Sequence, residues 1–289
     1  MKYYIKVFID QLFQKLNLKL VKQVKMPELY DTYSVESLNE KRFYNIGAGS
    51  FSHPLWRNID YSSNHYNSMQ HAGFINYNLM DMAPLPIEAD TAEIIYSSHT
   101  IEHINDDAVL NMLKEAYRVL KPGGCIRLTT PDAWLEYQAY LKRDISFWHW
   151  QIRYYSRKGY WESLFKIPLS SASIHQLFLH HFASQLTEID VDDTQKKKYS
   201  DTEIIQIFSN KSMEEGLDFF TKQCKFNAEH PGNHINWWDY DKLHSFLKEA
   251  GFNTIYRSGY GQSLFAPLRD TTLFDNTHPA ISLYVEAIK

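Results

Sequence analysis

The sequence is poor in cysteine and lacks long apolar runs and excess positive charge. Cys125 and Cys224 are its only cysteines, too few and too far apart for a disulfide framework or a cysteine-type zinc site, so we expect a reducing, cytoplasmic setting. No run of about 18 apolar residues and no secretory signal is found, which argues against a membrane span or export. A net charge of -4 argues against a nucleic-acid partner, because such a protein needs a basic surface.

What is present fits a folded enzyme. Of the 289 residues, 44% are hydrophobic, enough to bury a large core in one α/β domain with an inserted subdomain.

The segment from Phe43 to Asp60 predicts a strand, a Gly-Ala-Gly turn and a second strand that ends on a carboxylate. Gly47 and Gly49 have no Cβ, so the backbone can approach a ligand closely there. Asp60 is placed to accept hydrogen bonds from the hydroxyls of a ribose. The pattern favours a cofactor that contains adenosine.

Downstream, the spacing of apolar residues predicts a buried strand over 94–96 and a helix over 108–120. Lys-Pro-Gly-Gly at 121–124 is expected to end the helix, and 125–130 reads as the next parallel strand. The loops after these strands then face one crevice.

Four motifs occur in order: NIGAG at 45–49, WRNID at 56–60, YSSHTIEH at 96–103 and RVLKPGG at 118–124. With them the chain resembles the class I S-adenosylmethionine (SAM) dependent methyltransferases, and more closely the type 11 branch associated with polysaccharide and lipopolysaccharide biosynthesis. The resemblance implies an α/β fold with a Rossmann-like seven-stranded sheet flanked by helices. It also implies SAM as the cofactor.

The resemblance assigns cofactor contacts to residues after the strands. They are Asn45, Gly47, Ala48, Gly49 and Ser50 near the methionine part, Asp60 and Tyr61 near the ribose, Asp81 and Met82 at the adenine edge, and Ser97, Ser98 and His99 at the reacting end. Asn45 stands where the family usually has an acid, so its contact should be weaker. Phe51 stands where a third glycine is common, and the link from Gly49 to Asp60 is too short for the usual helix, so we expect a more open pocket.

A base near the transferred methyl would help if the acceptor is a hydroxyl, and the catalytic candidates are His99, His103 and Asp132. His99, Glu102 and His103 form HxxEH, similar to the ExxEH with which ubiquinone-pathway and small-RNA O-methyltransferases hold a divalent metal. The same EH pair starts a helix beneath the cofactor in type 11 enzymes without metal. The pattern favours that structural role, so no metal ligand is assigned.

We expect four parts: an N-terminal amphipathic helix and connector (1–40), a SAM-binding core (41–132), an aromatic-rich helical cap for the acceptor (133–234) and the C-terminal completion of the core (235–289). The basic amphipathic helix can pack on the enzyme, contact a second subunit in a dimer or lie peripherally on the inner face of a membrane. Three cap histidines, His175, His180 and His181, are expected to be structural.

These features predict methyl transfer from SAM to a hydroxyl of a sugar or glycan precursor, a small-molecule or glycan acceptor. One alternative is an enzyme for a small aromatic or quinone-like metabolite. Another is a SAM-binding subunit without catalysis, suggested by Asn45 and the short first loop. A nicotinamide oxidoreductase is disfavoured because the third glycine of its motif is missing.

Overall fold

The computed structural model describes residues 26–62, 73–149, 166–190 and 196–289. The chain divides into two compact units, Met1–Ser34 and Val35–Lys289. In the first unit, helix α2 (Met26–Tyr30) ends at Tyr30, and the ring of Tyr30 contacts that of Tyr33 with centroids 6.2 Å apart. The amphipathic helix expected near the N-terminus lies mostly outside the described residues.

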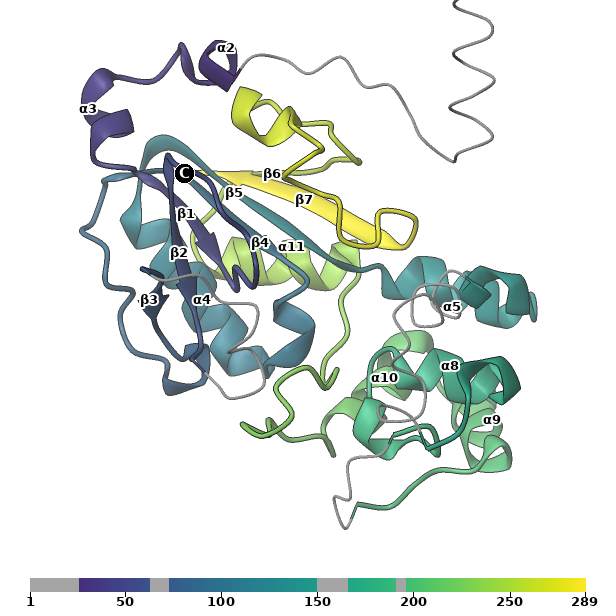
Figure 1. Ribbon diagram of the computed structural model, residues 1–289. Coiled ribbons are helices and arrows are strands. Elements are labelled where there is room, and N and C mark those ends of the chain that lie inside the picture. The colour runs from purple at the N-terminus through teal and green to yellow at the C-terminus, as the bar shows by residue number, and fades with distance from the viewer. Residues whose placement is uncertain (1–25, 63–72, 150–165, 191–195) are drawn as a thin grey trace, which may run out of the picture. The chain divides into compact units, whose positions relative to one another are not determined.

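The second unit is built on one seven-stranded sheet (Figure 1). Its strands are β1 (Phe43–Ile46), β2 (Trp56–Asp60), β3 (Ile75–Asn76), β4 (Ala92–Ser98), β5 (Leu120–Pro131), β6 (Thr254–Arg257) and β7 (Ser282–Ile288). The order is β3-β2-β1-β4-β5-β7-β6, and β7 runs antiparallel to both of its neighbours while the other pairs are parallel. The predicted seven-stranded class I methyltransferase sheet is confirmed.

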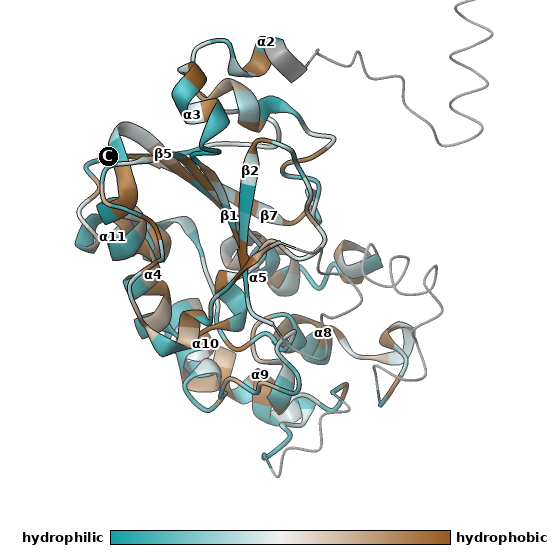
Figure 2. Ribbon diagram, turned by 60° about the vertical axis from the view of Figure 1, so that its left-hand side comes forward, coloured by the Kyte–Doolittle hydropathy of each residue, from teal (hydrophilic) through white to brown (hydrophobic). Residues whose placement is uncertain are grey.

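Helices α4 (Asp106–Val119) and α11 (Tyr240–Glu249) cover one face of this sheet. Their apolar sides pack on alternate strand residues such as Tyr44, Ile46 and Ile95, as expected where successive side chains point to opposite faces. Figure 2 shows both apolar and polar stretches along α4 and α11. The helix predicted over 108–120 starts earlier, because the Asn105 side chain accepts a hydrogen bond from the amide of Ala108 and caps it.

One predicted boundary differs in detail. Residues 121–124 belong to β5 instead of forming a loop after the helix, because the strand already pairs with Ala92 through Leu120. Helix α11 begins at Tyr240, because Asp239 accepts a hydrogen bond from the amide of Lys242 as its N-cap. The C-terminal residues complete the sheet as β6 and β7.

The opposite face of the sheet is covered by the segment 258–281, which contains the 3-10 helix η6 (Ala266–Arg269). Phe274 packs there against Trp56 and Tyr96, with ring centroids 4.8 and 5.0 Å apart. Arg127 of β5 holds the segment in place with a bidentate contact to Asp275.

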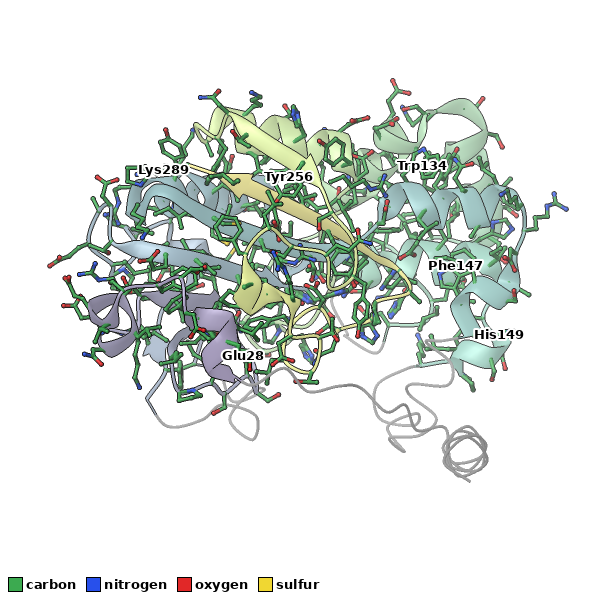
Figure 3. The ribbon with its side chains drawn as sticks, turned by 90° about the horizontal axis from the view of Figure 1, so that it is seen from above. Glu28, Trp134, Phe147, His149, Tyr256 and Lys289 are labelled. Carbon is green, nitrogen blue, oxygen red and sulfur yellow. The ribbon has the colours of Figure 1, made fainter. Side chains whose placement is uncertain are left out.

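The helical cap has a hydrophobic core of its own. Its elements are α5 (Ala133–Leu141), η3 (Ile145–Trp148), η4 (Leu169–Ser171), α8 (Ile174–His180), η5 (Ser184–Leu186), α9 (Asp201–Asn210) and α10 (Met213–Thr221). Tyr140 stacks on Phe178, and Phe208 packs edge-on against both rings. Figure 3 labels Trp134 and Phe147 in this cap. Five further aromatic residues of the expected aromatic-rich cap lie outside the described residues: Trp150, Tyr154, Tyr155, Tyr160 and Trp161.

Three further short elements complete the second unit: α3 (Val35–Asn39), η1 (Leu79–Asp81) and η2 (Ile101–His103). Across the described ranges, every helix is too short or too polar to cross a bilayer.

Candidate active site

The glycine turn after β1 is shaped by its neighbours. Gly47 has φ +70° and Gly49 has φ +52°, a left-handed backbone that favours glycine. A Cβ on Gly47 would lie 2.1 Å from Thr100 Oγ1, whereas a Cβ on Gly49 would meet nothing within 4 Å. Gly47 is therefore required by packing, and Gly49 leaves open space beside the turn.

Asp60 ties the end of β2 to this turn. Its Oδ2 accepts a hydrogen bond from the amide of Gly49 at 2.7 Å, and its Oδ1 accepts one from the amide of Tyr61 at 2.7 Å. Each carboxylate oxygen has a second lone pair, so Asp60 can hold the turn and still accept from a ligand hydroxyl.

A pocket of about 330 Å³ lies at the carboxyl ends of the strands, the usual ligand position in open α/β sheets. Its lining comprises Ile46, Gly47, Ala48, Gly49, Ser50, Ile59, Asp60, Tyr61, Tyr77, Asn78, Leu79, Ser98, His99, Thr100, His103, Ile104, Phe226, Pro231 and Thr277. The strand order places Asn78, Asp60, Gly47 and His99 in that sequence across the crevice.

Most of the predicted cofactor residues line this pocket, namely Gly47, Ala48, Gly49, Ser50, Asp60, Tyr61, Ser98 and His99. Four do not belong to its described lining. Asn45 and Ser97 are buried in β1 and β4, Asp81 accepts a hydrogen bond from the side chain of Asn78, and Met82 is 49% exposed. Their cofactor roles stay predictions.

Sequence reasoning missed several lining residues. Thr100 lies inside the YSSHTIEH motif and Asn78 inside the segment before Asp81, so both had a signal nearby. Phe226 and Pro231 come from the cap and Thr277 from the segment before β7. Nothing in the local sequence marked these three, because only the tertiary fold brings them to the crevice.

His99 is held from both sides of its ring. It follows β4 with φ +50°, and its Nδ1 lies 3.1 Å from Glu102 Oε1 while its Nε2 lies 2.8 Å from Ser282 Oγ. Both nitrogens are engaged, so His99 is a poor base toward a ligand in this arrangement.

His103 presents a different ring. Its Nδ1 donates to the carbonyl oxygen of Asn233 at 3.2 Å, and its Nε2 lies 3.9 Å from Glu102 Oε1. Because Nδ1 carries the proton of the neutral imidazole, Nε2 carries the lone pair. His103 also lines the pocket, which places an unprotonated ring nitrogen at its edge.

Glu102 is buried between these rings, with its side chain 1% exposed. Burial alone would raise the pKa of Glu102, but the imidazoles of His99, His103 and His234 lower it overall. Its Oε2 accepts from Thr130 Oγ1 at 3.2 Å, so Oε1 remains directed at the histidines.

His234, from the end of the cap, joins this pair. The ligand atoms of Glu102, His103 and His234 lie within 4.8 Å of one another, a set that could hold a metal ion. The HxxEH motif contains His99 and does not contain His234. Sequence spacing cannot reveal His234 as a partner of Glu102, because His234 lies far along the chain.

The third catalytic candidate, Asp132, has structural partners. Its Oδ1 caps α5 through the amide of Leu135 at 3.2 Å, and its Oδ2 pairs with Arg257 at 2.5 Å. It is not part of the described pocket lining. Its catalytic role stays a prediction.

The cap histidines contact cap residues. His175 Nδ1 bonds to the hydroxyl of Tyr140, and His180 Nδ1 to that of Thr187. His181 pairs with buried Glu136. Burial raises the pKa of Glu136 well above its usual range and lowers that of His181 to about 3.

The pocket fits SAM by its donor and acceptor set. The open space beside Gly49 admits a close ligand, and the carboxylate of Asp60 can accept ribose hydroxyl protons. Apolar Leu79 and Ile104 line the same space and suit a flat adenine ring.

Comparison with known proteins gives the family of this region. Residues 47–128 match the family of methyltransferase domains, while a search of curated proteins found no match. Among solved structures, a possible histamine N-methyltransferase from Thermotoga maritima is 12% identical over 100% of both chains with a TM-score of 0.39. A SAM-dependent methyltransferase from Mesorhizobium loti is 12% identical over 88% of this chain and 96% of its own, with a TM-score of 0.37.

A third solved structure is a putative methyltransferase from Haloferax volcanii in complex with the Trm112 methyltransferase activator. It is 10% identical over 90% of this chain and 92% of its own, with a TM-score of 0.40. Residues 47–128, which include the glycine turn, Asp60 and His99, are therefore similar to the family of methyltransferase domains.

Proposed function

We propose that this protein transfers a methyl group from SAM to a hydroxyl oxygen of a sugar or glycan precursor. One observation carries the proposal: the same pocket is lined by the glycine turn and Asp60 and by the imidazole of His103. On this proposal, the cofactor site and a group that can activate an acceptor share one space.

The chain's own residues would hold the cofactor and align the acceptor. Gly47 to Ser50 supply close backbone, and Asp60 supplies acceptors for ribose hydroxyls. SAM brings the reactive methyl on its sulfonium, so the protein mainly orients the nucleophile and excludes water.

His103 is the residue we propose for activating the acceptor. The Asn233 carbonyl fixes its tautomer, so Nε2 carries the lone pair. His99, which is bonded on both ring nitrogens, would instead position Glu102 and the wall of the pocket.

The acceptor class is supported by the hydroxyl side chains of the pocket lining. Ser98, Thr100 and Thr277 line the pocket with hydroxyls, which can bond to a polyol better than to an aromatic metabolite. The type 11 motifs point to the same substrate class.

The first test is calorimetric titration with S-adenosylhomocysteine. Asp60→Ala should weaken binding at least tenfold, about 1.4 kcal/mol, because the ribose acceptor and the tie to Gly49 are lost. Asp241→Ala, an exposed carboxylate on α11, should bind like the wild type. An absence of wild-type binding would contradict the proposal.

The acceptor is tested by the release of S-adenosylhomocysteine from SAM. The purified protein is incubated with a set of sugar nucleotides and, separately, with catechols and quinols. Turnover with sugar nucleotides alone supports the glycan class, whereas turnover only with the aromatic set would replace it. His103→Ala should keep cofactor binding and lose turnover.

A further inference from the structure

The tautomers of two histidines leave an unusual set of lone pairs around Glu102. His103 Nδ1 and His234 Nδ1 lie 3.2 and 2.7 Å from the carbonyl oxygens of Asn233 and His181. A carbonyl oxygen can only accept, so both nitrogens must carry the proton. The nitrogen available on each neutral ring is therefore Nε2, which is an acceptor.

The carboxylate between them adds acceptors and no donor. Glu102 Oε1 lies 3.9 Å from His103 Nε2, and its Oε2 is occupied by the hydroxyl of Thr130. Three groups that can only accept thus share one partly buried space, with ligand atoms within 4.8 Å. Such an arrangement is unfavourable unless a cation lies among them.

A proton on His99 would neutralise only part of this set. Ser282 Oγ lies 3.1 and 2.9 Å from the carbonyls of Thr277 and His278, so it donates there and accepts from Nε2 of His99. A second proton on His99 Nδ1 would then bond Glu102 Oε1 at 3.1 Å. This second proton on His99 would still leave the Nε2 lone pairs of His103 and His234 without a cation.

The surrounding chain holds these ligands in place. The carbonyl of Glu102 accepts from the amides of Ile235 and Asn236 at 2.9 and 3.1 Å, which fixes the His234 loop against η2. The carbonyl of His234 accepts from the amide of Ser184 at 3.0 Å. Ring N–H groups bonded to backbone carbonyls are the usual support of histidine ligands.

We propose that Glu102, His103 and His234 bind one divalent transition-metal ion, such as Zn²⁺, at the edge of the cofactor pocket. Two imidazoles and a carboxylate suit this class of ion. Three protein ligands leave a position open, and His103 also lines the pocket. On the proposed function, that position takes the acceptor hydroxyl, and the metal lowers its pKa so that the proton passes to solvent water. The oxygen then attacks the methyl group and S-adenosylhomocysteine leaves, so with the metal bound His103 acts as a ligand and not as a base.

The test is calorimetric titration of chelator-stripped protein with Zn²⁺, beside a titration with S-adenosylhomocysteine. We expect one site in the wild type, with an affinity reduced at least tenfold in Glu102→Gln and in His234→Ala. His244→Ala, on α11 away from the cluster, is the matched control and should bind Zn²⁺ like the wild type. Cofactor titration of every variant checks that each is folded.

Replacement with Co²⁺ gives a measurement that needs no variant, because the visible absorption of Co²⁺ reports low-coordinate binding by nitrogen and oxygen. If the wild-type protein does not bind Zn²⁺, the metal site is overturned. Equal binding of Zn²⁺ by all three variants would overturn it as well. If S-adenosylhomocysteine still binds in that case, the proposed methyl transfer stands. If Zn²⁺ binds and the cofactor does not, the metal site stands and the proposed function fails.

Discussion

At the residue scale, Gly47 and Gly49 have similar backbones and different surroundings. Both have positive φ, but Thr100 fills the space where a Cβ on Gly47 would stand, and nothing fills it at Gly49. Within one motif, Gly47 is therefore needed for packing and Gly49 for ligand access.

This difference can be measured by two alanine variants. Gly47→Ala combines left-handed strain with a steric clash and should lower the free energy of unfolding by about 2–4 kcal/mol. Gly49→Ala carries the strain alone but should weaken S-adenosylhomocysteine binding at least tenfold, since its methyl group enters the space beside the turn. Chemical denaturation and calorimetry check both. Wild-type affinity in Gly49→Ala would show that the ligand stays away from this residue.

His180 predicts a pH dependence of stability. Burial lowers the pKa of His180 to about 3, below the value of about 6.5 in an unfolded chain. Between these two pKa values the unfolded state binds more protons than the folded state. The contribution of neutral His180 to the free energy of unfolding is therefore fully present above about pH 6.5 and is lost as the pH falls.

From pH 6.5 to pH 5, the free energy of unfolding should decrease by up to about 2 kcal/mol through this histidine. His180→Asn should show a flatter profile in urea titrations over the same range. Parallel profiles for the two proteins would contradict the assignment.

At the element scale, Asp132 acts as the N-cap of α5 and partner of Arg257. Asp132→Ala should cost about 1 kcal/mol of stability through the lost cap, and Asp132→Asn should cost less because asparagine also caps. Neither should change S-adenosylhomocysteine affinity, since Asp132 is not in the described pocket lining. Loss of turnover in Asp132→Asn with stability retained would instead support the catalytic role predicted from sequence.

At the scale of the whole molecule, Arg127 joins the sheet to the segment that covers it. Its guanidinium is fully buried and contacts Asp275 at 2.5 Å and Glu286 at 2.7 Å. It also donates to the carbonyls of Gly259 and Gln262, so one side chain holds both ends of the covering loop.

Arg127→Leu should lower the free energy of unfolding by about 3–5 kcal/mol, because two buried carboxylates lose their partner. Lys222→Leu, which breaks the exposed pair with Asp218, should leave the denaturation midpoint nearly unchanged. Similar midpoint shifts in the two variants would contradict a dominant role for the buried network.

The sequence by itself determined the strand, turn and strand of the cofactor site, since glycine, a closing carboxylate and apolar periodicity act over a few neighbouring residues. Gly47, Gly49, Asp60 and His99 line the pocket for that local reason. The tertiary structure alone decided which distant groups meet them. His234 reaches Glu102 because cap and core share backbone hydrogen bonds, and Phe226 reaches the pocket by the same folding of the chain. Contacts across so many residues depend on packing, which no local pattern records.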